Sequence, residues 1–377
     1  MSSSLEAIKK YLHRNTFALF VSVFLLNIFY TILVSLLAPT HSSFATATCQ
    51  WDCFWYKEIV SYNYSALPRL YDQNRLAQAD WAFFPLYPWA TKVFANFSHL
   101  SFEWSGLIIN LFLWPAVITL SYKDILQRIG SISPFLFSLF FLIYPFNIWY
   151  HSQYSESTYG FFLILLIIGS YNNNLLLSSI SSFLLSFSRP TGFIVTCIMS
   201  LSKFFDNVKN NLLSKKDIFS NENILCPLTI VAGGAGLSLF ILYLYHLTGD
   251  GLAFAHAEKA WGKTGIFSSF NISYYIHHKN KIIFLFYFFM SLFLLWKMRA
   301  RKWRLNMLVT AGTLILVCCS GLTSVERYIF SNPLVIEFLA FQAMQLERKK
   351  LTLVLILCAI FNFLGMGLWL HHTHLLI

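Results

Sequence analysis

The sequence predicts an all-α polytopic membrane protein, on the evidence of its composition, its apolar segments and its charge distribution. Of the 377 residues, 57% are hydrophobic and only 11% are charged, whereas a soluble domain usually carries about 25% charged residues. The mean hydropathy is +0.59, and a water-soluble chain could not bury this much apolar surface. Because the apolar segments are spread evenly, we expect a single transmembrane domain over residues 1–377.

Eleven segments approach the roughly 20 apolar residues that a helix needs to cross a bilayer. They are helical because backbone polar groups in lipid must bond within the segment. These segments are residues 17–38, 104–122, 132–150, 157–171, 175–188, 191–202, 224–247, 282–296, 305–320, 329–346 and 351–370. We therefore expect about 11 transmembrane helices. The first segment is too long for the core of a signal peptide and has no clear cleavage site, so we expect it to be an uncleaved span.

The basic residues predict how the spans are oriented. With the N-terminus in the cytoplasm and alternating spans, the cytoplasmic segments hold 17 of the 27 Lys and Arg residues, as the positive-inside rule requires. The formal net charge of +11 therefore reflects topology and not nucleic-acid binding. Two long outer loops result, 39–103 and 248–281. Within the first, the proline-containing aromatic segment 81–89 is expected to lie at the lipid interface without spanning it.

The segment Trp-Asp-Cys-Phe-Trp-Tyr at 51–56 follows the first span and is the first candidate for chemistry. Apolar neighbours raise the pKa of a carboxyl group, which would make Asp52 a better proton acceptor. The aromatic rings could pack on the C–H faces of sugars. An interfacial aromatic belt with an incidental acid explains the segment equally well. Cys49 and Cys53 could pair in an oxidising compartment, but we favour the interpretation that they are small packing residues.

Two further motifs lie at predicted outer turns: Tyr-Ser-Glu-Ser at 154–157 and Arg-Pro-Thr-Gly at 189–192. Pro190 and Gly192 favour a tight reversal between two spans. Arg189 then lies at the outer surface, against the positive-inside trend. A lipid phosphate would suit it, since guanidinium binds phosphate through two parallel hydrogen bonds. An ion pair with Glu156 is the alternative.

The remaining two motifs are residues 249–262 and 324–328. The first contains His256 and Lys259, which share a face if the segment is helical. A lone His or Arg in an outer loop is usually just solvated, but all five motifs fall on the same predicted side. The sequence contains no Gly-rich phosphate-binding loop, no zinc-protease motif and no nucleophile elbow of the serine hydrolases.

At these motifs the sequence resembles the PIG-V family of mannosyltransferases. The shared pattern is Trp-Asp-x-x-Trp-Tyr at 51–56, Phe-Phe-Pro-Leu-Tyr-Pro at 83–88, the two tetrapeptides, the string at 249–262, and Arg-Tyr at 327–328. The resemblance covers most of the chain in the same order. Gly251 departs from the family pattern, which has a proline at this position. The chain is also shorter than eukaryotic members of the family.

The resemblance implies a GT-C glycosyltransferase fold with the active site on the outer face. It implies transfer of mannose, with inversion, from polyprenyl- or dolichyl-phosphate mannose to a glycolipid or other acceptor. The partners would be that donor, the acceptor, membrane lipid and a candidate small membrane subunit, with no nucleic acid. No cofactor is expected, and no divalent metal, because a lipid phosphate leaving group carries less charge than a nucleoside diphosphate. A bacterial inner (plasma) membrane is favoured, or the ER membrane for a eukaryotic member.

For this reaction we expect Asp52 to be the general base, with Glu156 as the second candidate. The candidate donor-phosphate ligands are Arg189, His256, Lys259 and Arg327. The candidate sugar- or lipid-binding residues are Trp51, Trp55, Tyr56, Tyr87, Trp261 and Tyr328. The alternatives are a lipid-linked sugar transporter (flippase) and a non-catalytic scaffold of a glycosyltransferase complex. Transporters place polar residues at mid-membrane, whereas only Glu337 is predicted inside a span here.

Overall fold

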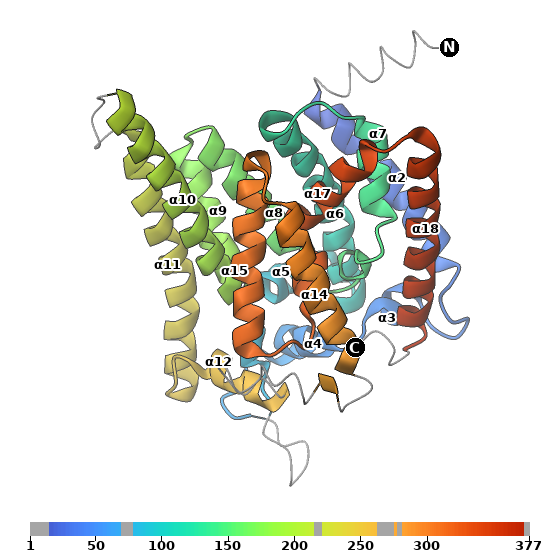
Figure 1. Ribbon diagram of the computed structural model, residues 1–377. Helices are drawn as coiled ribbons and strands as arrows, with labels where there is room; N and C mark the ends of the chain where they lie inside the picture. Colours follow the sequence, from blue (N-terminus) through green and yellow to red (C-terminus); the bar gives the residue numbers. More distant parts are fainter. Residues whose placement is uncertain (1–14, 69–77, 215–220, 262–274, 277–280, 373–377) are drawn as a thin grey trace. The chain divides into compact units, whose positions relative to one another are not determined.

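A computed structural model describes residues 15–68, 78–214, 221–261, 275–276 and 281–372, and its regular elements are helices (Figure 1). Each of the eleven apolar ranges predicted from the sequence contains a helix. Among the described residues, five helices are long and apolar enough to cross a membrane: Thr16–Ser35, Phe102–Arg128, Asn223–Thr248, Arg301–Ser320 and Arg348–Leu370. Four shorter apolar helices accompany them: Glu156–Tyr171, Leu175–Ser188, Ile282–Lys297 and Pro333–Met344. The predicted all-α polytopic membrane protein is confirmed.

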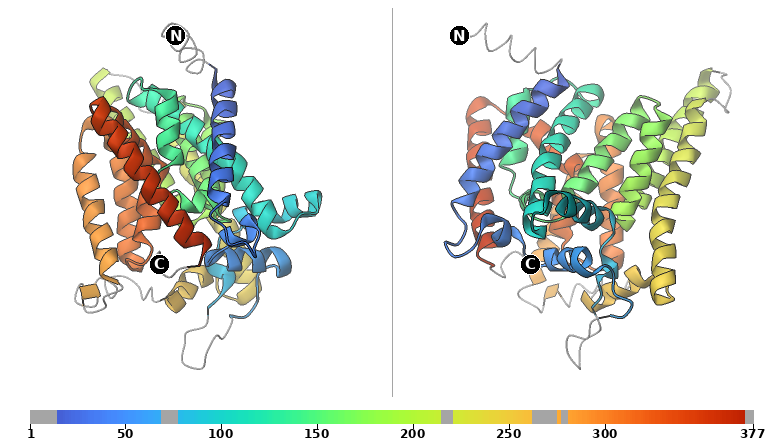
Figure 2. Two further views of the ribbon diagram at one scale, coloured as in Figure 1. Left: turned by 90° about the vertical axis from the view of Figure 1, so that its right-hand side faces the viewer. Right: turned by 180° about the vertical axis from the view of Figure 1, so that it is seen from behind.

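The helices group into two compact units, and the first comprises residues 1–54, 91–161 and 330–377. Its elements are α2 (Thr16–Ser35), α3 (Phe44–Thr48), α6 (Phe102–Arg128), α7 (Pro134–Leu142), η2 (Ile148–His151), α17 (Pro333–Met344) and α18 (Arg348–Leu370). The helices α2, α7 and α17 pack on α6, and α18 packs on α2, α3 and η2. The right-hand view of Figure 2 shows α2, in blue, beside α6, in teal. In its core the rings of Trp114 and Tyr150 stack, with centroids 3.8 Å apart.

The second unit comprises residues 55–90 and 162–329. Its elements are η1 (Asp80–Ala82), α9 (Leu175–Ser188), α10 (Pro190–Ser214), α11 (Asn221–Thr248), α12 (Ala253–Ala257), η3 (Glu258–Trp261), α14 (Ile282–Lys297), η5 (Arg301–Trp303) and α15 (Arg304–Ser320). Four helices contain residues of both units: α4 (Asp52–Tyr62), α5 (Leu86–Ser98), α8 (Glu156–Tyr171) and α16 (Val325–Phe330).

Small residues allow α9, α10 and α11 to pack closely (Figure 1). A Cβ added at Gly236 of α11 would lie 2.2 Å from the backbone oxygen of Phe183 on α9, so only glycine fits there. The Ser182 hydroxyl of α9 donates a hydrogen bond of 2.8 Å to the Thr229 carbonyl of α11. Close backbone approach and interhelical hydrogen bonds are the usual basis of helix packing in membranes, where lipid removes the hydrophobic driving force.

Two predicted spans are interrupted in the structure. In the range 132–150, α7 ends at Leu142, because Pro145 follows and the Asn147 side chain donates hydrogen bonds to the carbonyls of Phe141 and Leu142. In the range 329–346, α16 ends at Phe330 and a new helix begins at Pro333. The length of each apolar range predicts one continuous span, but the capping side chains end the helices earlier.

Glu337, predicted to be alone inside a span, has a partner in the first unit. Its side chain is fully buried, and its carboxylate lies 3.4 Å from the Arg128 guanidinium, which also pairs with Asp124 one turn earlier on α6. The helix α6 continues to Arg128 and does not end at residue 122 as predicted. The two buried carboxylates and the guanidinium group form an ion cluster. Charged side chains within a membrane span usually pair in this way, because an unpaired charge is costly there.

Candidate active site

The loop that carries Asp52 is held by a disulfide between Cys49 and Cys53, whose Cα atoms are 5.2 Å apart. The favoured sequence interpretation, that the two are small packing residues, is therefore wrong. Trp51 has a φ of +52°, and Asp52, directly after it, is the first residue of α4. The Asp52 side chain is half-buried and remains in contact with solvent. A carboxylate in the first helical turn is stabilised by the helix dipole.

Glu156, the second candidate base, lies in the same unit as Asp52 but in a different environment. It is the first residue of α8 and is 2% exposed. A general base must come within hydrogen-bond distance of the acceptor hydroxyl, which favours the more accessible carboxylate, Asp52. The assignment of a catalytic role to either residue stays a prediction.

Three of the sequence motifs meet in an aromatic cluster in the second unit. The ring of Trp55 stacks on Phe83 with centroids 5.8 Å apart, and the edge of Trp261 contacts both, at 5.6 and 5.9 Å. Tyr56 contacts Phe83 and Tyr87 edge to face, at 5.3 and 5.1 Å. Edge-to-face and offset pairs at these distances stabilise the cluster beyond the burial of apolar area.

The members of the aromatic cluster differ in exposure. Trp55, Tyr56 and Tyr87 are 6%, 4% and 0% exposed, so their faces are engaged within the protein. Trp261 is half-buried and can present part of its ring to a ligand. Trp51, in the first unit, is also half-buried. Trp51 and Trp261 are therefore the more accessible candidates for sugar stacking, which stays a prediction, and the three buried rings pack within the aromatic cluster of the second unit.

Arg189 and Arg327 lie at the ring of the same residue, Tyr328, within the second unit. Their guanidinium carbons are 5.9 and 5.8 Å from the ring centroid, within the range of cation–π attraction. Arg189 is held by the turn between α9 and α10, where a Cβ added at Gly192 would lie 2.3 Å from the Leu185 carbonyl oxygen. Two predicted phosphate ligands from distant parts of the chain are thereby brought to one ring.

His256 and Lys259 occupy the short helices α12 and η3 of the second unit, and both side chains are exposed. The Nδ1 atom of His256 lies 2.6 Å from a carboxylate oxygen of Asp250. This hydrogen bond lowers the pKa of Asp250 below its usual value. The carboxylate also accepts the Leu252 N–H at 2.9 Å, so Asp250 fixes the start of α12 and orients the imidazole.

Glu326, next to Arg327, was not assigned a role from the sequence. It is 8% exposed, and burial raises its pKa to about 7. Its Oε2 atom has no hydrogen-bond partner among the residues that the structure describes. Its position directly before Arg327 in an outer motif was the available signal. Asp250 and Tyr154 likewise lie within sequence motifs, and residue type alone predicts no role for them.

Within the described ranges, no group of three or more His, Cys, Asp or Glu side chains is arranged to hold a metal ion. The expectation that transfer needs no divalent metal stays a prediction. The second half of the loop 248–281 falls largely outside the described residues.

No family model matches the chain, and no curated protein sequence matches it. The chain is similar in structure to the Archaeoglobus fulgidus oligosaccharyltransferase, solved in complex with Zn and sulfate, with a TM-score of 0.52 and 10% identity. The match covers 92% of this chain and 53% of that protein, so this chain spans about half its length. The archaeal oligosaccharyltransferase AglB from Archaeoglobus fulgidus, in complex with an inhibitory peptide and a dolichol-phosphate, gives a TM-score of 0.48 at 12% identity, covering 94% and 55%.

The first of these similarities concerns the fold, since so low an identity carries no residue-level correspondence. Oligosaccharyltransferases of this kind have the GT-C architecture, which the family resemblance implied for this chain. The chain is an all-helical, polytopic membrane protein with a GT-C-like fold.

Proposed function

We propose that the protein is a membrane glycosyltransferase that transfers mannose from a polyprenyl- or dolichyl-phosphate-mannose donor, with inversion, to a glycolipid or other acceptor on the extracytoplasmic face. The observation that carries the proposal is the pair Arg189 and Arg327, both within 6 Å of the Tyr328 ring centroid. Guanidinium groups bind phosphate through charge-assisted hydrogen bonds, which makes this pair the candidate for contacting the donor phosphate. The GT-C-like fold supports the same class of reaction.

In the proposed reaction Asp52 accepts the proton of the acceptor hydroxyl as its oxygen attacks the anomeric carbon of mannose. The bond between that carbon and the phosphate oxygen breaks, and its electron pair stays on the lipid phosphate. Arg189 and Arg327 stabilise this developing charge electrostatically. His256 and Lys259 are further candidate cations for the same anion. Attack opposite to the leaving phosphate inverts the anomeric centre.

The disulfide between Cys49 and Cys53 supports the proposed sidedness. Disulfides persist in oxidising compartments outside the cytoplasm. The loop that carries Asp52 would therefore face the periplasm, the cell exterior or the ER lumen, as the distribution of basic residues also predicts.

Transfer should be measured with the full-length protein in vesicles that contain radiolabelled polyprenyl- or dolichyl-phosphate mannose and a glycolipid acceptor. We expect Asp52→Asn to lower kcat by roughly 10² to 10⁴-fold, as for loss of a general base. Arg189→Ala should instead raise the KM for the donor. Asp206→Asn and Arg304→Ala are matched controls, because these residues form an exposed ion pair at 2.6 Å and should leave transfer unchanged.

Each alternative predicts a different result in the same vesicles. Movement of labelled donor across the bilayer without transfer would indicate a transporter. Neither movement nor transfer, with partner proteins still bound, would indicate a scaffold. Equal transfer by the wild type, Asp52→Asn and Arg189→Ala would reject the assigned roles.

A further inference from the structure

Asp52 directly follows a residue in an uncommon backbone conformation. The φ of Trp51 is +52°, in the left-handed region that large side chains rarely occupy. Such a conformation persists only where surrounding contacts impose it. The contacts that hold residues 50–52 therefore decide where the Asp52 carboxylate points.

The hydroxyl of Tyr154 bridges the two residues on either side of Trp51. It donates a hydrogen bond to the Gln50 carbonyl at 3.0 Å and accepts one from the Asp52 N–H at 3.1 Å. Tyr154 is 1% exposed, so water cannot easily replace either bond. The Asp52 N–H lies in the first turn of α4, where backbone N–H groups find no acceptor within their own helix. One buried hydroxyl oxygen therefore links the residues on either side of Trp51 through two hydrogen bonds.

Tyr154 is itself fixed by its neighbours in the first unit. Its ring contacts the edge of Trp369, near the end of α18, with centroids 5.6 Å apart. The indole N–H of Trp369 donates to the Thr48 carbonyl at 3.1 Å. Buried Asn110 donates to the Tyr154 carbonyl at 2.9 Å. The ring and the backbone carbonyl of Tyr154 are therefore both held within the first unit, which fixes where the hydroxyl lies.

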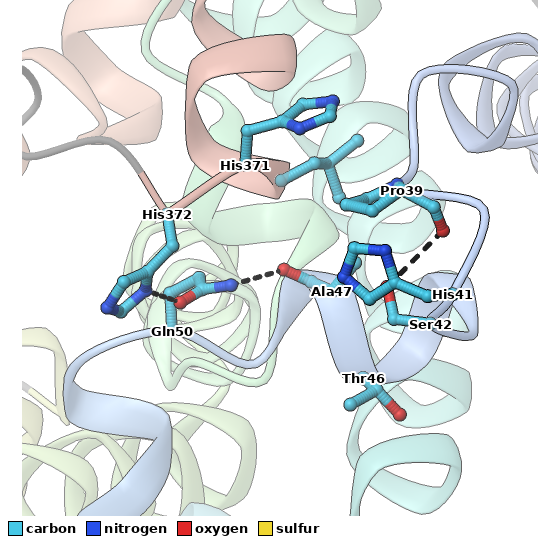
Figure 3. Close-up of a pocket in the computed structure, with 9 residues that line it drawn as sticks. Pro39, His41, Ser42, Thr46, Ala47, Gln50, His371 and His372 are labelled. Atoms are coloured by element: carbon cyan, nitrogen blue, oxygen red, sulfur yellow. Dashed lines mark hydrogen bonds between the residues drawn. The ribbon is translucent and has the colours of Figure 1, made fainter.

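The residues after α18 contact the same loop from its other side. The imidazole of His372 stacks on Trp51, with centroids 5.2 Å apart and planes 15° from parallel. His372 also hydrogen-bonds the Gln50 side chain, whose amide donates to the Ala47 carbonyl at 2.8 Å (Figure 3). These groups border a pocket of 280 Å³ at the ends of α2 and α18. The Trp51 ring is thus braced by an aromatic partner from the opposite end of the chain.

From these contacts we infer that Tyr154 is a positioning residue for Asp52, with Trp369 supporting the Tyr154 ring and His372 supporting the Trp51 ring. The inference rests on the proposed function, in which Asp52 is the base. It assigns a role to the motif at 154–157 through its tyrosine and not through Glu156. Loss of the Tyr154 hydroxyl would remove one hydrogen bond each from the Asp52 N–H and the Gln50 carbonyl, and the loop would hold the Asp52 carboxylate less firmly while the donor-phosphate ligands are unaffected.

The test is Tyr154→Phe, which removes one oxygen and keeps the ring against Trp369. We expect kcat for transfer to fall roughly 10- to 100-fold, as for displacement of a catalytic group by about 1 Å, with the donor KM unchanged. Tyr150→Phe is the matched control: Tyr150 is also buried, at 2% exposure, and its hydroxyl donates to the Ser331 carbonyl at 2.6 Å, away from the loop. Amide hydrogen exchange in peptides covering residues 50–53 gives a second readout that needs no catalysis.

Faster exchange at residues 50–53 and a lower kcat in Tyr154→Phe alone would support the inference. Wild-type kcat and exchange in Tyr154→Phe would overturn it, and so would an equal loss of kcat in both tyrosine variants, since that indicates general destabilisation. If the wild type transfers no sugar from any lipid-phosphate donor, the proposed function is rejected, while the exchange data still decide whether Tyr154 holds the loop.

Discussion

The buried carboxyl of Glu326 should make the stability of the protein depend on pH. Burial raises its pKa from 4.5 to about 7, even though the adjacent Arg327 favours the charged form. A carboxyl whose pKa is higher in the folded state than in the unfolded state binds more protons when folded. Its contribution to stability is therefore fully present below pH 4.5 and is lost as the pH rises through 7.

The size of the effect follows from the shift in pKa. A change of one unit corresponds to about 1.4 kcal/mol, so a shift from 4.5 to about 7 amounts to about 3 kcal/mol over the whole range. Most of this loss falls between pH 5 and pH 7, because the unfolded chain is already ionised there while the folded protein is not. Glu326→Gln keeps the shape of the side chain and removes its titration.

Thermal unfolding in detergent micelles, followed between pH 5 and pH 8, measures this effect. We expect the wild type to lose Tm relative to Glu326→Gln as the pH rises. Glu347→Gln is the control, since the Glu347 side chain is 77% exposed and its removal should leave the pH dependence as in the wild type. Parallel Tm curves for wild type and Glu326→Gln would refute the reasoning, because they would mean that this carboxyl does not change its protonation on unfolding.

Three further predictions concern packing and the loop of the candidate base. Arg128→Met leaves two buried carboxylates without their cation and should cost about 3 kcal/mol or more, seen as a lower Tm in detergent. Cys49→Ser opens the disulfide and should lower kcat for transfer with little change in the donor KM, and unchanged kcat would argue against a role for the disulfide. Gly236→Ala forces a Cβ to 2.2 Å from the Phe183 carbonyl and should cost about 1–3 kcal/mol. In contrast, Gly234→Ala meets its nearest neighbour at 3.6 Å and should retain the wild-type Tm.

Most of the fold could be predicted from apolar segment length. Each predicted range contains a helix in the structure, because lipid leaves the backbone few alternatives. The errors lie where a polar side chain ends a helix inside an apolar stretch. Asn147 caps α7 by folding back onto two of its last carbonyls, and Asn332 caps the start of α17 through the Leu334 N–H. Hydropathy averaged over a window does not register a single capping residue.

The candidate site was harder to predict because it depends on contacts between distant residues. The sequence put Arg189 and Arg327 on one side of the membrane, but nothing in it indicated that Tyr328 would lie beside both. The spacing of Cys49 and Cys53 allowed a disulfide without requiring one. The burial of Glu326 could not be inferred from a helix of six residues, since so short an element shows no periodicity.

Among the aromatic residues predicted to bind sugar or lipid, the structure separates buried rings from partly exposed ones. Residue type alone does not make this distinction. Trp55, Tyr56 and Tyr87 look like sugar-binding residues in the sequence, yet each is buried and packs on other rings. Their role is to hold Phe83 and Trp261 in place, and Trp261 keeps part of its ring accessible. The aromatic cluster therefore combines one partly exposed ring, Trp261, with buried rings that support it. For that reason substitution of a buried ring should reduce folding yield before it changes substrate preference, whereas substitution of Trp261 should act on the KM for substrate.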